Sequence, residues 1–105
     1  MGAGEFETAV QRLIKQVGHW EAARWHAPAS AGGGIRAEVV RALVQRLADD
    51  GADAEQRRRR PVPRLADPVL PDQLRVMADD LLAAAPPAET LISATEAVSA
   101  AREAL

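Results

Sequence analysis

The hydrophobic pattern begins with a narrow apolar stripe in the first quarter of the chain. Apolar residues recur there at alternating steps of four and three: Phe6, Val10, Leu13, Val17 and Trp20. At about 100° per residue these positions span an arc of about 80°, which is typical of an amphipathic helix that packs on one side. We therefore expect a helix over residues 5–25.

Three further segments show helical periodicity, and the turn residues around them mark their ends. Residues 35–50 carry a broad apolar face and are followed by Gly51 as a stop signal. Residues 70–85 begin with Pro71, which suits the first turn of a helix. Residues 88–104 are rich in alanine, which favours a helix, although they hold few large apolar side chains. The pattern predicts a helix in each segment and no strand.

The connections between these helices limit the topology. About two residues join the last two helices and about eight join the first two, so each pair suits an antiparallel hairpin. The loop over residues 51–69 is longer than compact domains usually contain, and it either crosses over the bundle or links two separate hairpins. We predict an all-α fold, a small four-helix bundle made of two helical hairpins joined by a long loop with arginine and proline, as a single helical domain over residues 1–105.

Composition suggests that the core is thin. The 105 residues are 48% hydrophobic, but alanine supplies 23 of the 50 hydrophobic residues. Burial of a large apolar side chain contributes about 1.5 to 3 kcal/mol, whereas ordering the chain costs about 1.5 kcal/mol per residue. The thin core and the broad apolar face of residues 35–50 therefore favour a homo-oligomer or a contact with another protein.

No combination of polar residues points to catalysis, a cofactor or a metal. His19 and His26 lack a third ligand at helical spacing, and the absence of cysteine removes thiolate sites. Adjacent acids in the two Asp-Asp pairs diverge by about 100° on a helix, so neither pair converges on one point. The serines lack the context of a nucleophile, and the AGGGI stretch lacks a phosphate-loop pattern. We expect no enzyme activity, no cofactor and no metal site.

The sequence also predicts a soluble, cytoplasmic protein with no membrane contact. No run approaches the roughly 20 apolar residues of a membrane span, and the charges in the first residues do not fit a signal peptide. Abundant alanine and arginine are typical of a GC-rich genome. The segments QVGHWEAARW and PDQLRVMADDLLAA resemble parts of small helical proteins from such bacteria, a resemblance that implies no activity.

The strongest polar feature is a basic run beside two prolines, in QRRRRPVPRL. It comprises Arg57, Arg58, Arg59, Arg60 and Arg64. Arginine pairs with phosphates, so the run can bind nucleic acid. The prolines favour a polyproline II conformation, which a groove on another protein can recognise. In the interpretation that we favour, the arginines lie over the acidic faces of the last two helices, in the same chain or in a paired one, because those acidic partners already exist.

Trp25 is a further candidate for a contact surface. On a continuous helix it lies about 140° from Trp20, where it either anchors a partner or, as we favour, closes the end of the core. We therefore expect a non-catalytic protein-interaction or self-association module, with Trp25 and the five arginines as candidate interaction residues. The alternative is nucleic-acid binding or regulation through the basic loop 57–64.

Overall fold

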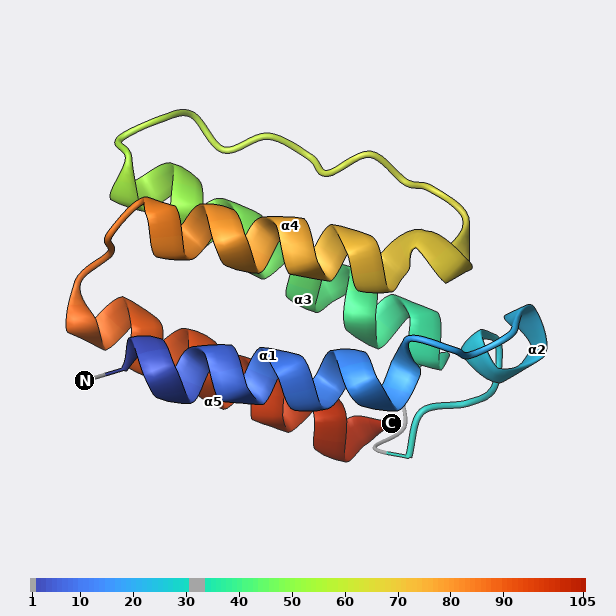
Figure 1. Ribbon diagram of the computed structural model, residues 1–105. Helices are drawn as coiled ribbons and strands as arrows, with labels where there is room; N and C mark the ends of the chain where they lie inside the picture. Colours follow the sequence, from blue (N-terminus) through green and yellow to red (C-terminus); the bar gives the residue numbers. More distant parts are fainter. Residues whose placement is uncertain (1, 31–33) are drawn as a thin grey trace.

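The computed structural model describes residues 2–30 and 34–105, and this part of the chain is all-α (Figure 1). Its elements are the helices α1 (Ala3–Val17), α2 (Ala22–Trp25), α3 (Arg36–Ala54), α4 (Leu70–Ala83) and α5 (Ala88–Ala104), with the 3-10 turn η1 (Asp67–Val69) before α4. The predicted all-α fold with four main helices is confirmed. None of the helices in the described ranges combines the length and the hydropathy that a bilayer crossing requires.

Each main helix has two neighbours in the bundle. The closest pairs are α3 with α4 and α1 with α5, and smaller contacts join α3 to α5 and α1 to α4. The consecutive helices α1 and α3, and likewise α4 and α5, therefore lie across the diagonals (Figure 1). This differs from the side-by-side hairpins expected from the loop lengths. A short connection limits the distance between two helix ends, but it does not decide which faces pack.

The long loop sets the direction of α4 relative to α3. Arg41, in the first half of α3, donates a hydrogen bond to the carbonyl of Leu65, just before η1 and α4. Near the other end, a Cβ placed on Gly51 would lie 3.9 Å from the Cα of Leu81. The two helices therefore run parallel, and the loop that connects them returns along the length of the bundle (Figure 1). Of the two courses open to the loop, it takes the crossover, which a parallel pair of consecutive helices requires.

The predicted helix over residues 5–25 is broken into two pieces. α1 ends at Val17, a turn follows at Gly18, and the short α2 begins at Ala22. The break turns Trp25 toward Trp20, and the two rings meet edge to face with their centroids 5.0 Å apart. A continuous helix would hold these indoles about 140° apart, so the turn lets both enter one core.

The second main helix is longer than predicted, and the loop is correspondingly shorter. Gly51 lies buried inside α3 and does not stop it. The helix ends at Ala54, where Gln56 adopts a positive φ of 56° and Arg57 donates its backbone N–H to the carbonyl of Ala52 at 2.8 Å. This pattern closes a helix in the way that glycine usually does. The irregular segment therefore covers residues 55–66.

A continuous core joins the four main helices. Its large members include Phe6, Val10, Leu13, Val17, Val40, Leu43, Leu47, Leu70, Leu74, Leu81, Leu91 and Val98. The broad apolar face predicted for the second helix is accounted for within the chain, because α3 packs on both α4 and α5. The face that favoured self-association is thus covered by the protein itself.

Candidate interaction surface

The basic loop forms an extended strap, a name we use for residues 55–66. It runs along the outer side of the α3–α4 pair from the end of one helix to the start of the other (Figure 1). Pro61 and Pro63 fix their own φ angles near about −65° and disfavour helical conformations at the residues before them. The sequence itself therefore keeps the second half of the strap extended.

Gln45 on α3 holds the middle of the strap. Its side-chain amide donates to the carbonyl of Arg60 at 3.0 Å, and its carbonyl accepts the backbone N–H of Val62 at 2.8 Å. The same amide group also donates to Asp49 at 3.0 Å, one turn along the helix. Val62 packs against the core in a half-buried position. One glutamine therefore satisfies two backbone groups of a segment that has no secondary-structure partner.

Two more side chains fix the end of the strap. Gln73 on α4, which is almost completely buried, donates to the carbonyl of Pro63 at 2.9 Å. Arg41 on α3 donates to the carbonyl of Leu65 at 2.9 Å and pairs with Asp67 in η1. The strap is thus bound to both helices that it crosses.

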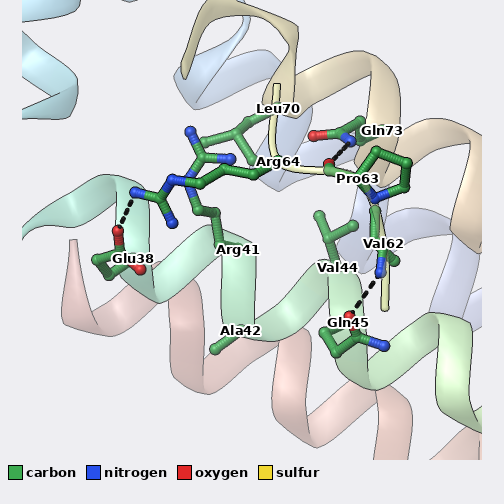
Figure 2. A pocket seen from close by; sticks show the side chains of 10 residues that line it. All are labelled: Glu38, Arg41, Ala42, Val44, Gln45, Val62, Pro63, Arg64, Leu70 and Gln73. Carbon is green, nitrogen blue, oxygen red and sulfur yellow. Dashed lines mark hydrogen bonds and ion pairs between the residues drawn. The ribbon is translucent and has the colours of Figure 1, made fainter. Parts of the chain in front are cut away.

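A small cavity of about 280 Å³ lies between the strap and the two helices (Figure 2). Three polar contacts join residues of its lining: Arg64 with Glu38, Gln45 with Val62, and Gln73 with Pro63. Ligand pockets usually measure about 300 to 1,000 Å³, so this cavity is at the lower limit. Its lining serves to hold the strap in place.

Three of the five candidate arginines pair with acids of the same chain. Arg59 makes a two-pronged contact with Asp53, at 2.6 and 3.0 Å. The other two pairs are Arg57 with Glu55 at 2.6 Å and Arg64 with Glu38 at 2.7 Å. We expected the arginines to lie over acidic residues of the last two helices. Three of them do pair with acidic residues of the chain, but these residues belong to α3 and to the residue that follows it. The strap lies nearer to α3 acids because it starts from that helix.

These ion pairs shift the acids' pKa values. The Arg59 guanidinium, hydrogen-bonded to Asp53, holds the pKa of that carboxyl below its ordinary value, and Arg64 does the same for Glu38. Asp50 differs, since burial raises its pKa and outweighs the attraction of Arg46. Exposed pairs of this kind contribute little to stability, so their main effect is to neutralise three arginines of the strap.

Arg58 and Arg60 are the two arginines of the strap that have no acidic partner among the described residues. Both are exposed, and neither side chain makes an ion pair or hydrogen bond with the rest of the described chain. The backbone carbonyl of Arg60 is held by Gln45. Two free positive charges therefore stand on a segment whose backbone is fixed.

Trp25 is not part of this surface. Its side chain is fully buried, so the tryptophan that was a candidate contact residue belongs to the core. Trp20 covers it, and the guanidinium groups of Arg24 and Arg36 lie 5.5 and 5.2 Å from the centre of the Trp20 ring. These cation–π contacts close the end of the bundle.

The two histidines are no longer on one helix face, because the turn after α1 separates them. His26 lies with its Nε2 3.2 Å from Asp67 Oδ2 and links α2 to η1. Within residues 2–30 and 34–105, no three His, Cys, Asp or Glu side chains come together in a way that could hold a metal ion.

Sequence reasoning missed the residues that hold the strap. Gln73 had a usable signal, since it is a polar residue next to Leu74 on the edge of an apolar helix face. Arg41 and Gln45 are four residues apart on α3 and had no such signal, because polar residues in that pattern usually face solvent. Their role depends on a segment that lies far along the chain.

Comparison with models of protein families, with curated proteins and with solved structures gave no match to this chain. The inference of a function therefore rests on the geometry of the strap and on the charges that it exposes.

Proposed function

We propose that this protein is a non-catalytic protein-interaction module and that the strap is its contact surface. One observation carries the proposal: Arg58 and Arg60 are exposed and have no partner for their side chains among the described residues, although three neighbouring arginines do. Free arginines are among the residues that contribute most to protein interfaces.

The fixed backbone of the strap supports the proposal. Gln45, Gln73 and Arg41 hold the strap through hydrogen bonds to its main chain, so its two free arginines stand on a rigid support. A segment that is already ordered loses less conformational entropy on binding than a flexible loop does. The strap is therefore suited to binding as it stands.

The charges of the strap favour an acidic protein surface as the partner. Guanidinium groups bind carboxylates in planar, two-pronged geometry. A nucleic acid is a weaker fit, because the chain has a net charge of −2 and the strap contains no aromatic residue on which a base could stack. Nucleic-acid binding is therefore the competing outcome of the test.

Binding to a labelled acidic polypeptide, poly-L-glutamate, tests the proposal by fluorescence anisotropy. The double variant Arg58→Ala/Arg60→Ala should lower the affinity at least about tenfold, as expected when two charge-assisted contacts are lost. The control Lys15→Ala/Arg102→Ala removes the same charge from exposed positions on α1 and α5 and should bind like the wild type.

Two results would count against the proposal. Equal losses in both double variants would mean that only net charge matters. A labelled single-stranded oligonucleotide that binds more tightly than poly-L-glutamate, with an affinity that falls steeply with salt, would favour the nucleic-acid function instead.

A further inference from the structure

A shallow apolar hollow lies between the first turns of α1 and α5. It measures about 210 Å³, and Ile92 in its lining is 51% exposed. The lining consists of Gly2, Glu5, Ile92, Thr95 and Glu96, and we call it the Ile92 hollow. The strap crosses the α3–α4 pair (Figure 1), whereas this hollow is lined by residues at the starts of α1 and α5.

The parallel course of α1 and α5 forms the hollow. At one end, a Cβ on Gly2 would lie only 3.3 Å from the Cβ of Leu91, and Gly2 has a φ of 108° that suits glycine alone. At the other end, Arg102 donates to Gln16 at 3.2 Å. The two helices therefore begin side by side, and the close approach at Gly2 leaves Ile92 uncovered beside it.

Two carboxylates line the hollow with Ile92, and a third lies one turn away on the same helix. Glu89 lies three residues before Ile92 and Glu96 lies four residues after it. Glu89, Ile92 and Glu96 therefore share one face of α5. Glu5 reaches the same hollow from α1, where its carboxylate accepts the backbone N–H of Gly2 at 2.9 Å. None of the three glutamates forms an ion pair within residues 2–30 and 34–105. The hollow thus combines an apolar side chain with Glu96, which makes no ion pair among the described residues, and with Glu5, whose pKa backbone hydrogen bonds hold below its ordinary value. Glu89 adds a third carboxylate one helical turn before Ile92.

One nearby cation restricts where a basic partner can lie. Arg12 lines the groove that continues between α1 and α5, toward the other end of the bundle. A positively charged segment is therefore attracted to the glutamates at the start of α5 and repelled further along. This polarity defines one end of the α1–α5 face as the docking position.

We propose that the Ile92 hollow binds the strap of a second copy of this chain, with Arg58 and Arg60 paired to Glu89 and Glu96. The proposal rests on the proposed function, since it names the acidic partner of the strap. Charge complementarity argues for it: the free arginines stand on the strap, which joins α3 to α4, and the glutamates stand on α5, which pairs with α1. Pro61, which is exposed beside Arg60, supplies an apolar group for Ile92.

The spacing of the charges is compatible with this pairing. Two residues of extended chain span about 6.6 Å, and seven residues of helix span about 10.5 Å. The long side chains of arginine and glutamate cover the difference of about 4 Å between these spans. Because different surfaces of each copy meet, the contact is head to tail and each added copy exposes a new strap and a new hollow.

Sedimentation velocity of the full chain over a range of concentrations tests the proposal. The wild type should pass from monomer to dimer and to larger species as concentration rises at about 50 mM salt, and should return toward monomer at about 500 mM, where the screening length is only about 4 Å. Arg58→Glu/Arg60→Glu and Glu89→Arg/Glu96→Arg should each remain monomeric. Lys15→Glu/Arg102→Glu, at the far ends of α1 and α5, changes the net charge as much as the arginine reversal does and should associate like the wild type.

Mixing the two reversed variants gives the decisive measurement. Each alone has a strap and a hollow of like charge, whereas the mixture restores opposite charges and should associate at least about tenfold more tightly than either variant alone. Circular dichroism of each variant alone checks that both are folded before they are mixed. A mixture that stays monomeric, or a wild type that is monomeric at every concentration, overturns the proposal. If that monomer still binds poly-L-glutamate through Arg58 and Arg60, the proposed function stands and only the second copy is excluded.

Discussion

The strap and the corner that follows α1 are both connections between helices, and both use arginine, but in opposite ways. In the corner, over residues 18–30, the guanidinium groups of Arg24 and Arg36 lie over the ring of Trp20 and help to close the core. In the strap, Gln45 and other helix side chains bind the backbone. The side chain of Arg58 is not needed to hold the strap, and it makes no ion pair among the described residues. An arginine is therefore available to bind a partner only where neighbouring rings and carboxylates do not already engage its guanidinium group.

The largest effect on stability should follow from removing the buried indole of the corner. Trp25→Ala removes a fully buried indole and should lower the free energy of unfolding by about 3 to 5 kcal/mol, measured by urea denaturation with circular dichroism. Trp25→Phe should cost less, because Nε1 of the indole has no hydrogen-bond partner among the described residues. A loss below about 1 kcal/mol for the alanine variant would mean that the corner is not part of the core.

Releasing the strap from α3 should lower the stability of the protein less and should make the strap more accessible to protease. Gln45→Ala removes the hydrogen bonds to the backbone of Arg60 and Val62, which should cost about 1 to 2 kcal/mol. Trypsin should then cut the strap faster than in the wild type. Gln11→Ala, which loses only an exposed bond to Glu7, is the control. Equal cleavage rates in the two variants would contradict the anchoring role of Gln45.

A change at the start of the strap should act in the opposite direction. Gln56 has a φ of 56°, which favours glycine, so Gln56→Gly should raise the free energy of unfolding by about 0.5 to 1 kcal/mol. Thermal unfolding followed by circular dichroism measures the shift. Destabilisation would show that the side chain of Gln56 contributes more than the strain of its backbone costs.

The smallest effect concerns the pH dependence of the paired arginines. Arg59 lowers the pKa of Asp53 in the folded protein. Stability from this pair is therefore present above the unfolded carboxyl pKa of about 3.9 and is lost as the pH falls through the lower folded value. Denaturation at a series of pH values should show Arg59→Ala slightly less stable than the wild type near neutrality and equal to it in acid. A difference that persists in acid would point to packing by the Arg59 side chain.

Several features of the fold could be read from local sequence. The periodic apolar residues identified the four main helices, and Pro61 with Pro63 indicated an extended segment, because both signals act within a few residues. The same reasoning failed at Gly51 and at residues 18–21. A glycine inside a helix is tolerated where another helix packs on it, and a helix breaks where a turn lets two tryptophans share one core.

The candidate site was only half predictable. The run of arginines was evident in the sequence, but the distinction between Arg59, which is paired, and Arg58, which is not, depends on the position of Asp53 in space. The anchoring role of Gln45 is likewise invisible in its own helix, since its partners lie 15 and 17 residues away. Such contacts between distant segments leave no periodic trace.

The sequence alone determined that this protein is helical and that its basic run lies in an extended segment. The tertiary structure decided which helices are neighbours, that the strap crosses between two parallel helices, that Trp25 is buried and that Arg58 and Arg60 remain free. The physical reason is range. Propensity, periodicity and proline geometry act over a few residues, whereas burial and ion pairing depend on which distant surfaces the whole chain brings together.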